Sequence, residues 1–204
     1  HIGYILLLDA LDEPDEIYGT KMARLLHTAQ ERGIKTSIDV VSESGDRFGR
    51  IVPPALKYTD YCVINELEAE ASTGVKLRDE NGALLKEKLP EALGKIKALG
   101  VSRWAVIHSP EGAYGVDESG NYIETESAPL PRSMIKGTVG AGDAFCSGVL
   151  YGAYCDLSLL EAIELGNAAA ACSLTESGAT EGMRTADEAL AFCQELREQA
   201  KAEA

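Results

Sequence analysis

Short apolar runs alternate with amphipathic stretches in the first half of this chain, and this alternation limits the possible folds more than any other feature. The run from Ile2 to Leu8 is continuously apolar, which is typical of a strand covered on both faces. Residues 15–32 have the periodicity of a helix that ends at Gly33, and residues 35–41 have the pattern of the next strand. A strand, a helix and a strand in this order predict a parallel sheet with a right-handed crossover.

The same alternation continues to the end of the chain. Further strands are expected at residues 61–64 and 104–108 and, as a hairpin, at 113–116 and 122–125. Further helices are expected at 51–58, 84–99, 144–154, from Ser158 into the alanine run, and at 185–204. With 204 residues and no linker or repeat, the chain is expected to form one α/β domain over residues 1–204.

Two glycines stand immediately before the helix expected at 144–154. Gly140, Ala141 and Gly142 form a turn whose backbone N–H groups would point out of the helix N-terminus, an arrangement that binds anions. Asp143 follows in the first helical turn, where a carboxylate can take a proton from an attacking hydroxyl while the N–H groups hold the developing charge. These groups are suited to phosphoryl transfer. Equally, Asp143 could simply favour the helix dipole and the glycines could simply make a turn.

Three motifs in order resemble one known family. Gly140-Ala141-Gly142-Asp143 is followed by Ala-Phe-Cys-Ser-Gly-Val-Leu, upstream stands Asn65-Glu66-Leu67-Glu68, and downstream Asn167 to Ala171 is followed by Ser177-Gly178-Ala179. Together they resemble the signature, the Asn-x-x-Glu motif and the nucleotide-pocket segment of the ribokinase-like (PfkB) carbohydrate kinases, which include adenosine kinases.

The resemblance implies a three-layer α/β/α fold with a mostly parallel central sheet. It also implies an ATP-dependent kinase that transfers the γ-phosphate to a primary hydroxyl of a sugar or nucleoside. Asp143 would be the general base, and Gly140, Ala141 and Gly142 the anion hole. Nucleotide contacts are implied for Asn65, Ser109, Gly112, Thr138, Asn167, Ala171 and Gly178.

Asn65 and Glu68 have two interpretations. Their three-residue spacing places both side chains on one face of the helix that begins there, and the resemblance implies that they hold Mg²⁺. The alternative is a capping box, in which Asn65 is the N-cap and Glu68 reaches back to its backbone. Gly148 and Gly152 also leave two interpretations, because a stripe of small residues permits either close helix packing or close approach of a nucleotide.

The chain departs from the family pattern at three places. Asp39 stands where the family has Asp-Pro-Asn-x-Arg, but Val40 follows here; a substrate contact is implied for Asp39, which could instead be a turn former before the polar loop expected at 42–49. Ser109 replaces the first glycine of the family's Gly-x-x-Gly-Ala turn, which Gly112 otherwise matches. Gly137 stands where many members have an aspartate that binds potassium, so a monovalent cation site is doubtful.

Composition excludes several other classes of protein. A net charge of −14 argues against nucleic acid or an anionic membrane as a partner. The five cysteines have no C-x-x-C spacing and are typical of buried thiols in a reducing compartment, and the three histidines are scattered, so a zinc site is not expected. No apolar run reaches membrane-spanning length, and a cytoplasmic location is expected. A homodimer is possible.

The resemblance covers only the nucleotide-binding part of such a kinase. Family members are about half as long again, and their N-terminal strands, lid and most sugar-binding residues are not readable in this sequence. Two functions are therefore considered: the catalytic part of a kinase, or a nucleotide-binding or regulatory module without transferase activity. An intact Asp143 favours the first, because a binding module needs no base there.

Overall fold

The computed structural model describes residues 1–41 and 47–203. Its contacts divide the chain into two compact units. The first comprises His1–Ser109 and Tyr114–Tyr122, and the second comprises Pro110–Ala113 and Ile123–Ala204. One domain over the whole chain therefore stays a prediction, and each unit is described by itself.

The first unit is built on parallel strands. Its strands are β1 (Ile2–Ile5), β4 (Ser37–Val40), β5 (Tyr61–Asn65) and β6 (Trp104–Ser109). Each pairs with the next in parallel. With β7 (Gly112–Val116) and β8 (Tyr122–Glu126), the sheet order is β1-β4-β5-β6-β7-β8. The connecting helices are α1 (Asp9–Asp12), α2 (Lys21–Glu31), α3 (Phe48–Leu56), α4 (Glu66–Thr73) and α5 (Leu89–Ala98). The predicted α/β fold with a mostly parallel sheet is confirmed.

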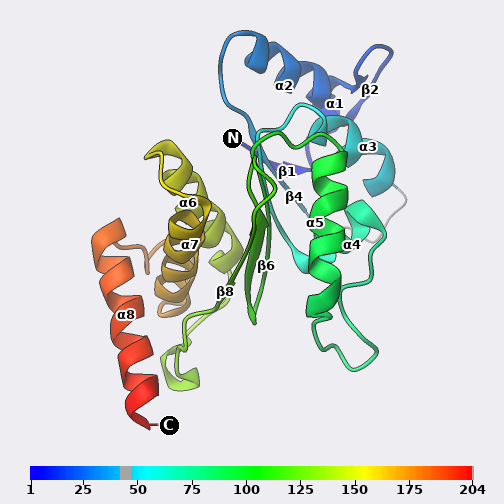
Figure 1. Cartoon of the computed structure of the whole chain (residues 1–204). Coiled ribbons are helices and arrows are strands. Elements are labelled where there is room, and N and C mark those ends of the chain that lie inside the picture. The colour runs from blue at the N-terminus through cyan, green and yellow to red at the C-terminus, as the bar shows by residue number, and fades with distance from the viewer. Residues whose placement is uncertain (42–46, 204) are drawn as a thin grey trace. The chain divides into compact units, whose positions relative to one another are not determined.

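Successive strands of this unit advance across the sheet in one direction. Right-handed crossovers between such strands place their helices on the same face of the sheet, and Figure 1 shows α3, α4 and α5 together beside the strands. Ile38, Ile64, Ile107 and Leu93 are completely or almost completely buried between sheet and helices. The continuous apolar runs of β5 and β6 are therefore explained by strands whose side chains are covered. The expectation of a strand covered on both faces from Ile2 to Leu8 is wrong, because β1 ends at Ile5 and the side chains of Tyr4 and Leu7 are exposed.

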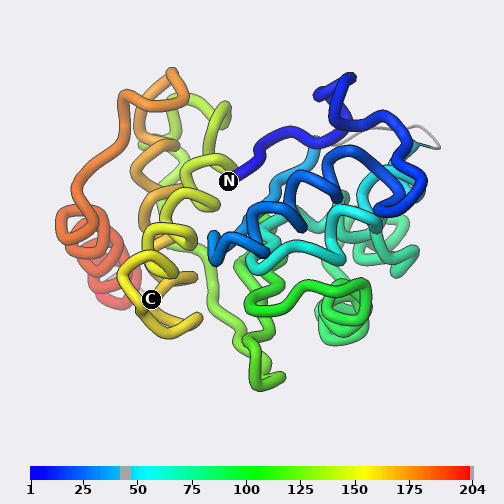
Figure 2. The backbone as a smooth tube through the Cα atoms, turned by 90° about the horizontal axis from the view of Figure 1, so that it is seen from above, coloured from blue at the N-terminus to red at the C-terminus, as the bar shows by residue number. Residues whose placement is uncertain are grey.

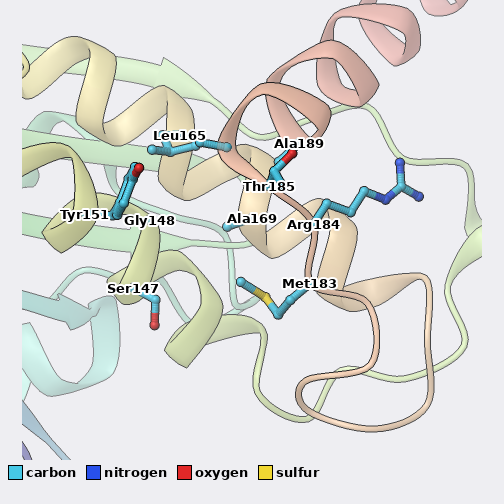
Figure 3. Close-up of a pocket in the computed structure, with 10 residues that line it drawn as sticks. Ser147, Gly148, Tyr151, Leu165, Ala169, Met183, Arg184, Thr185 and Ala189 are labelled. Atoms are coloured by element: carbon cyan, nitrogen blue, oxygen red, sulfur yellow. The ribbon is translucent and has the colours of Figure 1, made fainter. Parts of the chain in front are cut away.

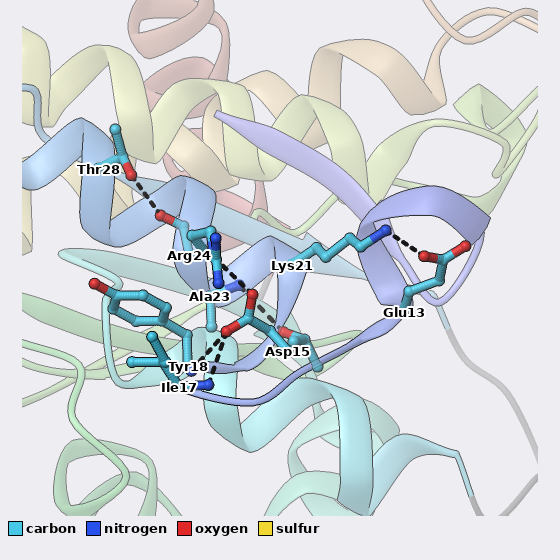
Figure 4. A network of polar contacts seen from close by, with 9 residues as sticks. Glu13, Asp15, Ile17, Tyr18, Lys21, Ala23, Arg24 and Thr28 are labelled. Atoms are coloured by element: carbon cyan, nitrogen blue, oxygen red, sulfur yellow. Dashed lines mark hydrogen bonds and ion pairs between the residues drawn. The ribbon is translucent and has the colours of Figure 1, made fainter.

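The prediction of a helix over residues 15–32 is wrong for residues 15–20. A two-stranded hairpin, β2 (Pro14–Asp15) and β3 (Gly19–Thr20), stands there instead, and α2 begins at Lys21 with Thr20 as its N-cap. Asp15 Oδ1 accepts the backbone N–H groups of Ile17 and Tyr18 at 3.0 and 2.9 Å (Figure 4). An aspartate that satisfies the following backbone in this way favours a turn over a helix.

Arg24 fixes this turn to α2. Its Nε lies 2.6 Å from Oδ2 of Asp15, whose side chain is 6% exposed, and Lys21 pairs with Glu13 beside it (Figure 4). The N–H of Tyr18, followed by Arg24, holds the pKa of Asp15 below its usual value. The turn is thus held by a contact that comes from the next helix.

Helix α3 is longer than expected at its start. Residues 42–46 of the loop expected at 42–49 lie outside the described residues, but Phe48 and Gly49 belong to α3, and Pro53 and Pro54 lie inside this helix. Two prolines remove two backbone donors. Burial of Phe48, Ile51, Val52, Ala55 and Leu56 offsets this loss, because packing of an apolar face stabilises a short helix more than propensity does.

Two further strands and two short 3₁₀ turns lie between residues 86 and 134. Strands β7 (Gly112–Val116) and β8 (Tyr122–Glu126) are neighbours in the sheet order, so the predicted hairpin is confirmed. The helix expected at 84–99 is a 3₁₀ turn, Lys86–Lys88, followed by α5, which has Pro90 at its start. A second 3₁₀ turn is Arg132–Met134.

The second unit contains three long helices: α6 (Ala141–Tyr154), α7 (Leu159–Leu174) and α8 (Ala186–Glu203). Helix α6 begins three residues before the expected Ala144. It lies directly beside α7 (Figures 1 and 2). A β-carbon on Gly148 would lie 2.7 Å from Cα of Gly166, and one on Gly152 would lie 2.6 Å from Cβ of Ala162. Close helix packing therefore explains the small-residue stripe.

Four of the cysteines are buried, as expected, but Cys155 is exposed because it is the C-terminal cap of α6. Within residues 1–41 and 47–203, none of the helices is both long and apolar enough to cross a membrane. The same residues contain no cluster of three or more His, Cys, Asp or Glu side chains suited to a metal ion.

Candidate functional site

The predicted glycine turn forms the N-terminus of α6. Gly140 is the N-cap residue with φ of +81°, a left-handed conformation that glycine adopts without steric cost, and its carbonyl accepts the N–H of Ala144 at 2.8 Å. Gly140 has no side chain that could accept the first N–H groups of the helix. Gly142 and Asp143 are exposed. The first N–H groups of a 14-residue helix thus lie at a glycine-lined, solvent-accessible turn, which fits a phosphate group.

This turn packs against the segment that follows α7. A β-carbon on Gly140 would lie 2.7 Å from Cβ and 2.9 Å from Cα of Ala179. A β-carbon on Gly137 would lie 2.9 Å from the carbonyl oxygen of Ser177. The N–H of Lys136 donates to Leu174 O at 2.9 Å. The structure therefore brings together the predicted residues Thr138 and Gly140 with the segment that contains Gly178.

Asp143 lies in the first turn of α6, where it is exposed, while the next two residues, Ala144 and Phe145, are buried. Burial of these neighbours fixes the helix, so the carboxylate projects from a rigid element. It stands at the positive end of the helix dipole, where a negative charge stabilises the helix. This position suits a proton acceptor next to an anion site.

Asn167 and Ala171 lie in the buried part of α7, 6% and 3% exposed. The side-chain amide of Asn167 donates to Oγ1 of Thr125 at 2.8 Å and, more weakly, to the carbonyl of Glu126 at 3.4 Å. These bonds tie α7 to β8. The structure thus gives Asn167 a structural role, and its contact with a nucleotide stays a prediction.

In the first unit, the remaining predicted residues lie at the carboxyl ends of the strands. Asn65 is the last residue of β5 and is paired in register with His108, which precedes Ser109 at the end of β6. Asp39 is the penultimate residue of β4, half-buried, and accepts the N–H of Val40 at 2.8 Å. Carboxyl ends of parallel strands are where α/β sheets bind ligands. Gly112, the first residue of β7, belongs to the second unit and is buried.

The capping box offered as an alternative for Asn65 and Glu68 is formed. Oδ1 of Asn65 accepts the N–H of Glu68 at 2.9 Å, and Oε2 of Glu68 accepts the N–H of Asn65 at 3.0 Å. Glu68 is only 6% exposed. Carboxylate and amide oxygens are nevertheless the ligands that Mg²⁺ takes, and each has more than one lone pair, so the donor set fits the ion. The magnesium role stays a prediction beside the structural one.

Sequence reasoning missed the partner of Glu66, which stands between these two residues. Arg78 Nη2 lies 2.6 Å from Oε1 of Glu66, and both side chains are mostly buried. The two residues are twelve positions apart, and the rest of α4 and a loop lie between them, so no periodicity could have paired them. Nothing in the sequence analysis had singled out Glu66 or Arg78.

The second unit also contains a pocket of about 420 Å³. Ser147 and Tyr151 of α6, Leu165 and Ala169 of α7, and the segment around Met183 line it (Figure 3). A hydrogen bond with Cys155 raises the pKa of Tyr151. Gly148, for which close approach of a nucleotide was one of two interpretations, also lines this pocket, whereas the residues implied by the family motifs for nucleotide or substrate do not.

A comparison with known protein families matches residues 8–186 to the model described as pfkB family carbohydrate kinase. The chain belongs to this family. The resemblance stated from its three motifs is therefore confirmed.

Curated kinase sequences are similar to parts of this chain. A 5-dehydro-2-deoxygluconokinase of Listeria monocytogenes is 35% identical over 81 residues, which cover 40% of this chain and 24% of the relative. A ribokinase of Haemophilus influenzae is 31% identical over 144 residues, which cover 67% of this chain and 42% of the relative. The matched part is thus less than half of these curated relatives.

Solved kinase structures share the fold of this chain. Phosphofructokinase-2 from Escherichia coli in complex with potassium matches with a TM-score of 0.68 at 23% identity, over 87% of this chain and 52% of that one. Arabidopsis thaliana ribokinase complexed with ribose and ATP matches with a TM-score of 0.68 at 20% identity, over 85% of this chain and 52% of that one. The chain spans about half the length of these structures.

Proposed function

We propose that this chain is the nucleotide-binding and catalytic part of an ATP-dependent kinase that phosphorylates a primary hydroxyl of a sugar or nucleoside. The observation that carries the proposal is the left-handed Gly140 at the N-terminus of α6, with Asp143 exposed in the first turn, in a chain of the pfkB family. A phosphate-binding turn and a carboxylate on one rigid helix are what transfer to an alcohol requires.

In this mechanism, Asp143 accepts the proton of the attacking hydroxyl. The hydroxyl oxygen forms a bond to the γ-phosphorus as the bond from that phosphorus to the bridging β,γ-oxygen breaks, and the bond's electrons remain on the leaving diphosphate. ATP supplies the phosphoryl group. The N–H groups at Gly140, Ala141 and Gly142 stabilise the negative charge on the transferring group.

The remaining roles follow the family motifs. Asn65 and Glu68 would hold Mg²⁺, which neutralises phosphate charge. Ser109, Gly112, Thr138, Asn167, Ala171 and Gly178 would contact the nucleotide. Asp39, near the carboxyl end of β4, would contact the acceptor. A cytoplasmic location and a homodimer stay predictions.

The alternative is a nucleotide-binding or regulatory module without transferase activity. Two measurements separate the functions: ATP binding to this chain with and without magnesium, and phosphorylation of a panel of sugars and nucleosides by the full-length gene product. Binding together with phosphorylation supports the kinase. Binding without phosphorylation of any acceptor supports the module, and absence of ATP binding contradicts both.

Glu68→Gln is expected to raise the magnesium concentration needed for activity of the full-length enzyme, because a carboxylate holds the hydrated ion more strongly than an amide. Thermal stability should change little, since Gln also serves in a capping box. The matched control is Glu161→Gln, because Glu161 closes another capping box, with Ser158, at the start of α7. A Glu68→Gln enzyme that loses stability and keeps its magnesium dependence would leave Glu68 as a cap alone.

The full-length enzyme is expected to show weak or no activation by potassium. Gly137 has no carboxylate where many pfkB-family members carry one, and the carbonyls of Glu176 and Ser177 would lie 3.1 and 2.9 Å from a β-carbon there. Carbonyl dipoles alone make a weaker cation site than carbonyls with a charge. Titration of potassium chloride against choline chloride at fixed ionic strength measures this, and a strong saturable rise in turnover would contradict it.

A further inference from the structure

We propose that Arg78 is a positioning residue for the magnesium ligands Asn65 and Glu68 and that it acts through Glu66. The inference rests on the proposed function, because that function assigns the metal to Asn65 and Glu68. Glu66 is the first residue of α4 and stands between them in sequence. It is 8% exposed, so its carboxylate needs a fixed partner.

Arg78 is that partner and holds one oxygen with two donors. Its Nη2 donates to Oε1 of Glu66 at 2.6 Å and its Nε donates to the same oxygen at 3.1 Å. The side chains are 18% and 11% exposed, so water screens the pair little. Two donors from a planar guanidinium fix the direction of the carboxylate as well as its distance.

Arg78 is itself held by the turn that follows it. Its Nη1 donates to the carbonyl of Gly82 at 3.0 Å. Oδ1 of Asp79 accepts the N–H groups of Asn81 and Ala83, both at 2.8 Å, and these bonds hold the pKa of Asp79 below its usual value. The guanidinium is thus oriented by a closed turn before it meets α4.

A second hydrogen bond joins the segment that contains Arg78 to α4, one helical turn after Glu66. The N–H of Leu77, which is fully buried, donates to Oε2 of Glu70 at 2.9 Å. Glu66 and Glu70 are four residues apart and lie on one face of the helix. Two attachments along one face, made by consecutive residues, oppose rotation of α4 about its axis.

This rotation decides where Asn65 and Glu68 point. In an α-helix, successive side chains point in directions about 100° apart, so the rotation of the helix about its axis sets the direction of each side chain. Glu68 lies in the first turn of α4, and a small rotation of this turn therefore displaces its oxygens relative to the end of β5. Residues that orient metal ligands without touching the metal typically alter metal affinity by about 10- to 100-fold when they are replaced. Arg78 would have this role for magnesium.

The test is the magnesium dependence of ATP binding to this chain in Arg78→Gln. The magnesium concentration for half-maximal binding is expected to rise about 10-fold or more, with ATP binding in the absence of magnesium unchanged. Arg78→Lys should recover part of the loss, because it restores the charge but not the two-donor geometry. The control is Lys88→Gln, which removes a half-exposed partner of Glu91 at 3.6 Å and should change nothing.

Several outcomes overturn the proposal. A folded Arg78→Gln chain with lower thermal stability but the same magnesium dependence would make Arg78 purely structural. If that variant does not fold, the neutral pair Glu66→Gln/Arg78→Gln, which leaves no buried charge unpaired, is measured instead, and an unchanged magnesium dependence there overturns the proposal equally. If the unmodified chain binds no magnesium-ATP, the proposed function fails. Hydrogen exchange of the Glu68 amide then decides the positioning: faster exchange in Arg78→Gln supports it, and unchanged exchange overturns it.

Discussion

Asp143→Asn is expected to lower the turnover of the full-length enzyme by roughly 10² to 10⁴, the usual contribution of a general base, while ATP affinity stays nearly intact. Asparagine preserves the shape of the side chain but cannot take the proton of the attacking hydroxyl. The N–H groups of the Gly140 turn, which carry the anion site, do not depend on that carboxylate. Initial rates at saturating ATP and a separate ATP-binding titration measure the two effects.

The control for this variant is Asp187→Asn. Asp187 is also an exposed aspartate in the first turn of a long helix, α8, so its replacement removes the same favourable interaction with a helix dipole. It should leave turnover unchanged. An Asp143→Asn enzyme with unmodified turnover, or an equal loss in Asp187→Asn, would remove Asp143 from the mechanism.

Strands β5 and β6 could be predicted from the sequence because burial decides their pattern. All residues of β5 from Tyr61 to Ile64 are buried, and a strand covered on both faces reads as a continuous apolar run. The hairpin before α2 could not be predicted in the same way. Asp15 favours a turn because its carboxylate accepts backbone N–H groups, and Arg24 of α2 forms an ion pair with it. The spacing of apolar residues contains no information about either contact.

In the candidate site too, residues whose role depends on local sequence could be predicted, and residues whose role depends on distant contacts could not. The role of Gly140 could be predicted because it depends only on local sequence. A glycine directly before a helical segment is enough to indicate a left-handed turn there. Asn65 and Glu68 gave two interpretations because one local spacing serves both a cap and a metal. The partnership of Arg78 with Glu66 depends on how a loop returns to a helix, and sequence spacing does not specify that path.

Gly140→Ala is expected to lower the turnover of the full-length enzyme by roughly 10²-fold, the cost of a displacement of about 1 Å at a site of chemistry. Alanine at φ of +81° is strained, and its β-carbon would lie 2.7 Å from Cβ of Ala179, where ordinary contact between carbons needs about 3.5 to 4 Å. The turn or the segment after α7 must therefore move. ATP affinity should fall in parallel, because the displaced groups are the N–H donors of the anion site.

Gly120→Ala separates strain from collision. Gly120 has φ of +85° but nothing within 4 Å of a β-carbon, so its replacement should cost only the left-handed strain, about 1 to 2 kcal/mol in the free energy of unfolding, with no change in ATP affinity. Gly140→Ala/Ala179→Gly removes the nearest colliding atom but leaves Cα of Ala179 at 2.9 Å, so it should recover part of the lost affinity. Chemical denaturation and ATP titration of all three variants measure these effects. If Gly140→Ala matches Gly120→Ala in both, the packing of the turn against Ala179 does not shape the anion site.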